Sequence, residues 1–277
     1  MTTLSESLVP PPDSTLRADH ALLVEAVRQA GAIALGHFRH EPEEWEKSPG
    51  NLVSEADLAS EVCLFQHLCR ARPDYGWLSE ESEDDIARLS AGRVWVVDPI
   101  DGTSNFSRGL PHFAVSVALL FRGQPMLAAI HCAPDGGLFT AVHGTGCWRN
   151  NRRITAPAGR FDDGAIVGCQ WFRGQKEMKF LPQLQSQGAR IRTLGSTVTQ
   201  LADVVMGRLD GNVQQQGRLW DFAAAGLVAV EAGVKFTDWH GRAVFPVKNL
   251  LIEHTATIAA TPAVHRRIAK LLRPYAG

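Results

Sequence analysis

The sequence predicts a mixed α and β protein, an α+β part followed by an α/β part. Between residues 113 and 154, apolar and β-branched runs are separated by short segments rich in Gly, Pro and Asn, which is typical of an antiparallel sheet. Beyond residue 165, short apolar runs alternate with segments of helical periodicity, which is typical of α/β layers. The 277 residues are enough for one large domain or two closely packed halves.

These patterns divide the chain into three segments. Residues 1–17 are polar and contain three consecutive prolines, so we expect a flexible N-terminal tail and not a signal peptide. Residues 18–154 form the α+β part, which is expected to carry the main motif. A polar stretch with Pro157 and Gly159 then leads into the α/β part, residues 155–277, which would complete the active site.

Two helices are expected before the antiparallel sheet. The first covers residues 18–39 and is followed by a loop over 41–50, which contains Lys47. The second begins at Ser54, and the apolar spacing predicts that its core face comprises Leu58, Val62, Phe65 and Cys69. An apolar run at 94–97 is expected to be a buried strand that ends at Asp98, because Pro99 has no N–H to donate.

The α/β part is expected to alternate strands with helices. The predicted strands are 165–169, 191–194, 209–213, 234–237 and 257–260. The predicted helices are 177–187, 197–205, 220–231 and a last one opened by Thr261 and Pro262.

Composition excludes several classes of protein. The formal net charge of −1 gives no general attraction to nucleic acid or to anionic membranes, and no apolar run is long enough to span a bilayer. The five cysteines are scattered and form no Cys-x-x-Cys pair, which argues against a disulfide framework or a zinc site. A reducing cytoplasm fits this cysteine usage.

One stretch, residues 95–106, carries most of the chemistry. Asp98 and Asp101 follow the buried strand and are three residues apart, so their carboxylates can converge on a hard cation such as Mg²⁺. Gly102, Thr103 and Ser104 come next and are expected to open a helix, whose free N–H groups attract phosphate. Asp-Pro and Asp-Gly are also ordinary turn dipeptides, which is the structural alternative.

The whole string Trp-Val-Val-Asp-Pro-Ile-Asp-Gly-Thr-Ser-Asn-Phe resembles the signature of the inositol monophosphatase family. This resemblance implies a layered αβαβα sandwich of the sugar-phosphatase type. It also implies a lithium-sensitive phosphomonoesterase that uses two or three Mg²⁺ ions. The expected partners are a small phosphate monoester and a second copy in a homodimer.

The resemblance assigns roles to individual residues. The metal ligands it implies are Glu80, Asp98, the Ile100 carbonyl, Asp101 and Asp221. Asp57 would orient Thr103, which with Glu80 would activate the attacking water, while the N–H groups of Gly102 and Thr103 would hold the phosphate.

Several of these residues have a structural alternative. Asp57 stands three positions after Ser54 and resembles the partner in a helix capping box. Asp221 begins a predicted helix and suits an N-cap. Lys47 and the acidic run at 83–85 are expected to be solvated.

The resulting hypothesis is Mg²⁺-dependent hydrolysis of inositol monophosphate or a related polyol phosphate by metal-activated water. Relatives that prefer inositol place a Glu shortly before a Trp-Asp motif, which is Trp220-Asp221 in this sequence. The nearest match to that Glu is Gln215, and Arg218 is expected to be a second substrate contact. A 3′(2′),5′-bisphosphate nucleotidase and a histidinol-phosphate phosphatase are the enzymatic alternatives. Trp171 and Phe172 would either line the pocket or pack in the core. A non-catalytic anion-binding regulatory module would show erosion of the metal ligands, and all of them are present.

Overall fold

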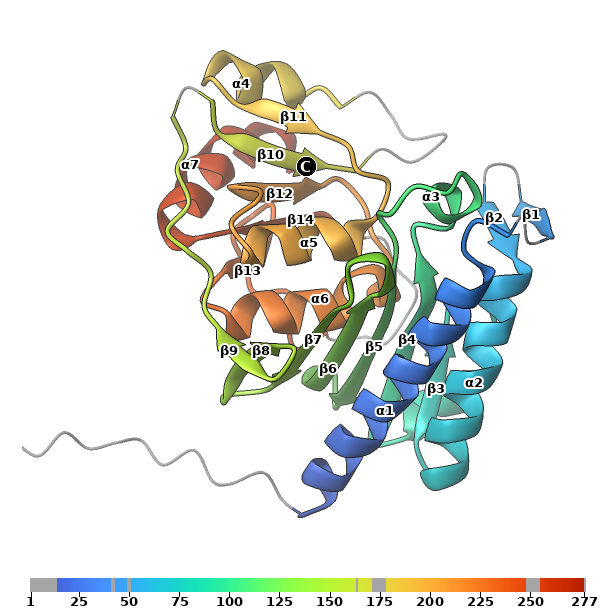
Figure 1. Cartoon of the computed structure of the whole chain (residues 1–277). Helices are drawn as coiled ribbons and strands as arrows, with labels where there is room; N and C mark the ends of the chain where they lie inside the picture. The colour runs from blue at the N-terminus through green and yellow to red at the C-terminus, as the bar shows by residue number, and fades with distance from the viewer. Residues whose placement is uncertain are drawn as a thin grey trace, which may run out of the picture.

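A computed structural model describes residues 14–40, 43–48, 51–162, 164–170, 178–247 and 255–276 (Figure 1). Trp171 and Phe172, and most of the predicted tail, lie outside the described residues. Helices and sheets alternate in five layers, so the expected αβαβα sandwich is confirmed. In the described part of the chain, no helix has the length and apolarity needed to cross a membrane.

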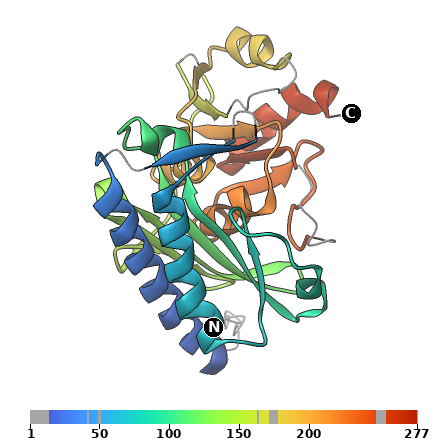
Figure 2. The ribbon, with the colours of Figure 1, turned by 90° about the vertical axis from the view of Figure 1, so that its right-hand side faces the viewer.

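The first two layers are a helix pair and a seven-stranded sheet. Helices α1 (Ser14–His37) and α2 (Glu55–Ala71) lie side by side on one face of this sheet (Figure 2). The first strand pair is parallel and the other pairs are antiparallel. In spatial order the strands are β3 (Gly76–Ser79), β4 (Arg93–Asp101), β5 (Ala114–Phe121), β6 (Gln124–Cys132), β7 (Gly137–Val142), β8 (Gly146–Arg149) and β9 (Arg152–Ile154).

Strand β4 shows why this sheet is buried on both faces. Successive side chains of a strand point to opposite sides, so an uninterrupted apolar run fills two cores. Trp95 and Val97 pack in the cluster formed with α1 and α2. Val94 and Val96 pack in the cluster formed with the next helix layer, α5 (Thr197–Val205) and α6 (Leu219–Glu231).

The last two layers are a five-stranded sheet and two outer helices, α4 (Leu181–Ser186) and α7 (Pro262–Leu272). The strands in spatial order are β11 (Arg190–Arg192), β10 (Ile166–Cys169), β12 (Gly211–Gln214), β14 (Thr257–Ala260) and β13 (Lys235–Asp238). Strands β10, β11 and β12 are parallel, and the other two pairings are antiparallel. The short elements are β1 (Glu44–Ser48), β2 (Asn51–Ser54), α3 (Thr103–Ser107) and 3-10 turns at Ile86–Ser90, Ala133–Asp135 and Arg273–Tyr275.

The N-terminal region differs from the sequence prediction in two ways. Helix α1 begins at Ser14, so the last four residues of the predicted 1–17 tail are helical. The predicted loop over 41–50 contains strand β1, which pairs antiparallel with β2 beside α3. The sequence predicted a loop here because the segment contains prolines and a glycine. The strands of this hairpin are polar and have no long apolar run that would have indicated them.

The predicted core face of α2 is wrong. Leu58, Val62 and Phe65 are 37%, 53% and 48% exposed, whereas the buried face carries Ala56, Asp57, Ser60, Cys63, Leu64 and Leu68. Both faces have helical spacing, so periodicity alone could not choose between them.

Two further boundaries are corrected. Strand β4 continues to Asp101, with a register irregularity between Asp98 and Asp101, where the sequence predicted an end at Asp98. The helix expected at 177–187 is only Leu181–Ser186, with Pro182 in its first turn. The acidic run at 83–85 is exposed, as predicted, and Asp84 also accepts a 2.8 Å hydrogen bond from the buried Arg88.

The contact between α1 and β6 gives a test of the packing. A Cβ on Gly31 would lie 1.8 Å from Nδ1 of His131, whereas one on Gly36 of the same helix would meet nothing within 4 Å. We expect Gly31→Ala to lower the free energy of unfolding by about 1–3 kcal/mol through overpacking. Gly36→Ala should raise it by up to about 1 kcal/mol through helix propensity. Urea unfolding measures both, and equal effects would contradict the packing described here.

Candidate active site

Three acidic side chains converge where β3, β4 and α6 meet. One carboxylate oxygen from each of Glu80, Asp98 and Asp221 lies within 4.8 Å of the other two. Strands β3 and β4 run parallel and pair Ser79 with Val97, and the Glu80 N–H donates to the Val97 carbonyl at 3.2 Å. These pairings place Glu80 beside Asp98. Asp221 comes from the first turn of α6.

Asp98 is the clearest sign that the cluster is built for a cation. Its side chain is 1% exposed, and among the described residues neither carboxylate oxygen has a hydrogen-bond partner. A buried carboxylate with no partner is strongly unfavourable unless a positive charge compensates it. Burial and the neighbouring Glu80 raise the pKa of Asp98 well above its usual range. The donor set, all carboxylate oxygen, fits a hard divalent cation.

Burial and repulsion between carboxylates also raise the pKa values of Glu80 and Asp221. Burial, followed by repulsion from Asp221, raises the pKa of Glu80 to about 8. Burial, followed by repulsion from Asp101, raises the pKa of Asp221 to about 7. Lys47 is exposed, as expected of a solvated lysine, and its Nζ also donates to Glu81 Oε2 at 2.6 Å, which places a positive charge near the cluster.

Asp101 is held differently from the other predicted metal ligands. Its carboxylate accepts hydrogen bonds from the first turn of α5, from the Val198 N–H at 2.7 Å, the Thr197 N–H at 3.3 Å and the Ser196 hydroxyl. A negative charge at a helix N-terminus is favourable. These bonds oppose the effect of burial, which raises the pKa of Asp101 to about 6. Asp101 stands next to the three-carboxylate group and is not a member of it.

Asp57 serves two purposes. Its Oδ2 accepts from the Ser54 N–H at 2.8 Å and the Ser54 hydroxyl at 2.5 Å, so the capping box at the start of α2 is confirmed. Its Oδ1 lies 3.1 Å from the Thr103 hydroxyl, as the catalytic assignment requires. The same hydroxyl lies 3.0 Å from the Ile100 carbonyl oxygen and donates to one of the two acceptors at a time. Burial raises the pKa of Asp57.

Gly102 makes the turn that joins the metal motif to α3. Its φ of 96° lies in the left-handed region, and an added Cβ would lie 2.7 Å from the His112 carbonyl oxygen. Only glycine fits there without strain. The helix that follows begins at Thr103, and the first N–H groups of a helix have no partner within the helix. The Asn105 side-chain amide stabilises the turn, because it donates to the carbonyl oxygens of His112 and Leu194, each at 2.7 Å.

The two predicted substrate contacts, Gln215 and Arg218, have different surroundings. Gln215 lines a cavity of about 360 Å³ together with Asp238, Trp239 and Arg242, and none of the three clustered carboxylates lines it. The Arg218 guanidinium lies over the Trp220 ring at 5.3 Å. The Arg218 N–H donates to Asp221 Oδ2 at 2.7 Å. Asp221 is therefore the third residue of α6 and not its N-cap, which is Arg218.

The residue before Gln215 is closer to the site. Gln214 ends β12 and is 2% exposed, and its side-chain amide lies 2.6 Å from the Thr197 hydroxyl, beside Asp101. Its Oε1 has no hydrogen-bond partner among the described residues. Sequence analysis passed over Gln214 because it took the neighbouring Gln215 as the nearest match to the Glu that relatives place before the Trp-Asp motif. Ligands of such sheets bind at the carboxyl ends of parallel strands, which is the signal that identifies it.

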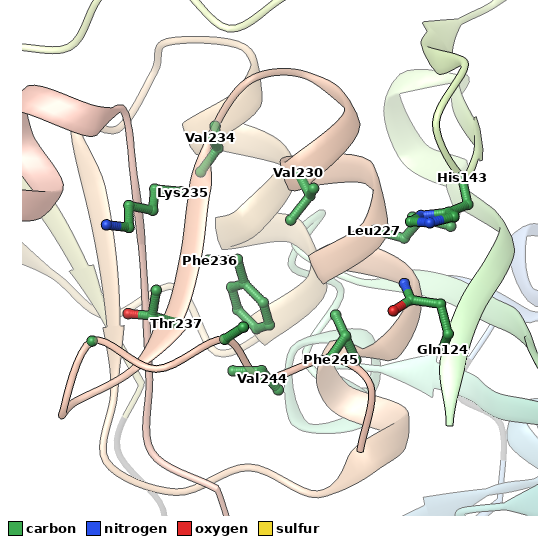
Figure 3. A pocket seen from close by; sticks show the side chains of 12 residues that line it. Gln124, His143, Leu227, Val230, Val234, Lys235, Phe236, Thr237, Val244 and Phe245 are labelled. Atoms are coloured by element: carbon green, nitrogen blue, oxygen red, sulfur yellow. The ribbon is translucent and has the colours of Figure 1, made fainter. Parts of the chain in front are cut away.

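A second cavity is not lined by the carboxylate cluster. This cavity of about 500 Å³ lies between the second half of α6, β13 and residues 243–245, and Figure 3 shows the side chains that line it. Its walls are mostly apolar, with Leu227, Phe236 and Phe245 pointing into the space and His143 and Gln124 at one side. None of the predicted site residues lines it.

A five-layer sandwich with a buried carboxylate cluster where its layers meet defines a metal-dependent hydrolase. Comparison with known proteins gives the family. Residues 16–276 match the inositol monophosphatase family. The chain therefore belongs to that family and is a phosphomonoester hydrolase.

Individual relatives agree with this assignment. An inositol-1-monophosphatase of Rhizobium meliloti is 38% identical over 200 residues, covering 70% of this chain and 75% of the relative. The Nus factor SuhB of Xylella fastidiosa is 34% identical over 227 residues, covering 79% and 82%. The extragenic suppressor protein suhB from Bartonella henselae has the same fold, with a TM-score of 0.83, 30% identity and coverage of 92% and 98%.

The raised carboxyl pKa values predict how stability depends on pH. Without metal, the folded protein holds protons on Glu80 and Asp221 up to about pH 8 and 7, whereas the unfolded chain has lost them. The folded state then binds more protons, so stability falls as pH rises. We expect urea unfolding in chelator to show a loss of about 1–3 kcal/mol between about pH 6 and 8.

Two controls accompany this measurement. Asp98→Asn removes a buried carboxyl group whose own pKa is raised, so it should lessen the pH dependence, and excess Mg²⁺ should lessen it as well. A wild-type stability in chelator that is constant or rises over this range would contradict the electrostatics of the cluster.

Proposed function

We propose that this enzyme hydrolyses a small phosphate monoester with Mg²⁺, and that the substrate is inositol monophosphate or a related polyol phosphate. The observation that carries the proposal is the unpartnered, buried Asp98 carboxylate within the cluster of Glu80 and Asp221. The name of the 38% identical relative, an inositol-1-monophosphatase, supports the substrate class.

In this proposal the metal ligands are Glu80, Asp98 and Asp221, together with the Ile100 carbonyl and Asp101, for two or three Mg²⁺ ions. When bound, Mg²⁺ neutralises the phosphate and activates the attacking water. Asp101 keeps acceptor capacity for this role, because a carboxylate has about four lone-pair sites and α5 uses only some of them.

Asp57 and Thr103 would direct the proton of the attacking water. The Asp57 carboxylate is fixed by Ser54 on one oxygen and faces the Thr103 hydroxyl with the other. When Thr103 donates to Asp57, its own oxygen presents lone pairs toward the site and accepts a hydrogen bond from water. Glu80, whose carboxylate belongs to the same cluster, is the second candidate for accepting a proton from that water.

The phosphate would rest on the turn at Gly102. The N–H groups of Gly102 and Thr103 begin α3, and donors at this point favour the charge of phosphate oxygens. Gly102 has a left-handed backbone conformation and no Cβ, so the turn can lie against the His112 carbonyl oxygen.

The leaving group would be recognised through Gln214, which replaces Gln215 in this role. Gln214 is buried beside Thr197 and Asp101, and its amide offers both a donor and an acceptor without charge. Such a group suits the hydroxyls of a polyol. Arg218 lies over the Trp220 ring and contributes to the site through its backbone contact with Asp221.

Phosphate release by the purified protein tests the activity. The panel would contain inositol 1-phosphate, 3′-phosphoadenosine 5′-phosphate and histidinol phosphate, each with Mg²⁺ or with chelator. We expect Mg²⁺-dependent release with a preference for the inositol ester. Asp98→Asn should lower kcat by on the order of a hundredfold or more, because an aligned metal supplies several kcal/mol of stabilisation.

Asp74→Asn, an exposed acid outside the cluster, is the matched control and should leave kcat unchanged. Release that is independent of Mg²⁺, or full activity of Asp98→Asn, would refute the proposed mechanism. A preference for the nucleotide or for histidinol phosphate would refute the substrate class alone.

The neighbouring glutamines test substrate recognition. Gln214→Ala should raise KM for the polyol phosphate by about 10-fold, because one buried hydrogen bond to a substrate hydroxyl is worth about 1–1.5 kcal/mol. Gln215→Ala should leave KM unchanged, since Gln215 lines a different cavity. Steady-state kinetics with both variants decides between them, and the opposite pattern would restore Gln215 to the site.

A further inference from the structure

Four side-chain amides lie between the second sheet and α5. Gln170 directly follows β10, Gln200 lies on α5, and Asn212 and Gln214 lie on β12 (Figure 1). Gln170 is partly buried, and the other three are 0%, 0% and 2% exposed. Amides are uncommon in a protein core, because each buried N–H and C=O needs a partner. A group of four therefore calls for an explanation beyond packing.

Hydrogen bonds join three of these amides. Gln200 Nε2 donates to Gln170 Oε1 at 3.1 Å, and Asn212 Nδ2 donates to Gln200 Oε1 at 3.3 Å. Gly168 on β10 makes room for this network, because an added Cβ would lie 2.6 Å from Gln200 Oε1. The partners determine which end of each amide faces inward, since the oxygen only accepts and the nitrogen only donates.

The orientation of the Gln170 amide follows from a backbone group. Its Oε1 also accepts from the Gly195 N–H at 3.1 Å. A backbone N–H can only donate, so the oxygen of Gln170 must face Gly195, and the nitrogen must face away from the network. Among the described residues, none accepts a hydrogen bond from this nitrogen. Gln170 thus offers an N–H donor.

Gln214 offers the opposite group. Its Nε2 donates to the Thr197 hydroxyl at 2.6 Å, and its Oε1 has no hydrogen-bond partner among the described residues. This oxygen is buried, and a buried acceptor is unfavourable until a donor reaches it. Gln214 thus offers an acceptor.

The donor and the acceptor stand at the carboxyl ends of neighbouring parallel strands. The last pair between β10 and β12 is Cys169 and Val213, so the next residues on the two strands are Gln170 and Gln214. Neighbouring strands lie about 4.8 Å apart. A hydroxyl with one hydrogen bond of about 2.8 Å on each side spans this distance.

The pair lies beside the turn that would hold the phosphate. Gly195 donates to Gln170, and its carbonyl oxygen lies 3.4 Å from the position that a Cβ on Gly102 would take. Thr197 stands two residues after Gly195 and contacts Gln214. A substrate with its phosphate on the Gly102 turn would therefore hold its leaving group beside both glutamines.

We propose that Gln170 and Gln214 together recognise one neutral hydroxyl of the leaving group. The hydroxyl accepts from Gln170 Nε2 and donates to Gln214 Oε1, which requires both a lone pair and a hydrogen. An ammonium has no lone pair for Gln170, and a carboxylate has no hydrogen for Gln214. Gln170 is thus a specificity-determining residue for uncharged polyol phosphates. This inference rests on the proposed function.

The same substitution at the two neighbouring positions tests the pair. Gln170→Glu keeps an oxygen for the network but turns the outward donor into an acceptor. Gln214→Glu adds the same charge at the same place and keeps an acceptor for the hydroxyl, while the Thr197 hydroxyl can donate to its other oxygen. Gln185→Glu changes an exposed glutamine on α4 and is the control for the added charge.

Kinetics with inositol 1-phosphate and with cyclohexyl phosphate, which has no hydroxyl groups, isolate the effect. We expect Gln170→Glu to lower the ratio of the two kcat/KM values by about tenfold, because one hydrogen bond to the substrate is lost. Gln170→Met, which lacks the donor and adds no charge, should give a similar loss. Gln214→Glu should keep the preference for the inositol ester, and Gln185→Glu should change neither value.

The outcomes separate this inference from the proposed function. A wild-type enzyme that does not prefer inositol 1-phosphate to cyclohexyl phosphate would refute the polyol substrate class, and this inference with it. A wild-type preference that both Gln170 variants retain would overturn the inference alone. An equal loss of preference in Gln170→Glu and Gln214→Glu would also overturn it, because the added charge would then be the cause.

Discussion

Mutual repulsion among buried carboxylates is the constraint on which this structure depends. Glu80, Asp98 and Asp221 come from two neighbouring strands and a helix of the next layer, and their oxygens converge around Asp98, which is buried, while Glu80 and Asp221 are partly exposed. The described part of the chain gives Asp98 no hydrogen-bond donor. The apolar sandwich around the cluster must therefore supply the stability that holds these charges together until a cation compensates them.

The site and the scaffold share the same side chains. Asp57 caps α2 and faces Thr103, Asp101 receives the first N–H groups of α5, and Asp221 accepts the N–H of Arg218 at the start of α6. Three helices thus begin on carboxylates of the site. The structural and catalytic interpretations of Asp57 do not compete, because one oxygen serves each purpose.

Local sequence patterns were enough to predict most of the fold. Contacts between segments far apart in the sequence could not be predicted from them. The layered fold and the carboxylates of the central motif could be predicted because strands, turns and motif spacing are local properties. The outward face of α2 could not, since Leu58, Val62 and Phe65 repeat as regularly as the buried face. Gln214 was missed because its neighbour Gln215 was taken as the nearest match to the family's Glu. The hydrogen bond from the Val198 N–H to Asp101 joins segments far apart in the sequence, so no local sequence pattern could predict it.

The hydrogen bonds of Asn105 and Asp101 also bear on how the protein is made. Both side chains lie next to the first sheet, and both bind groups between residues 194 and 198, which are synthesised much later. A growing chain that has reached only the first sheet leaves Asp98 and Asp101 in contact with water, where their charges are well solvated. The cluster is enclosed only when α5 and α6 pack onto that sheet. The loss of solvation and the repulsion within the carboxylate cluster thus arise only when the two sheets are joined.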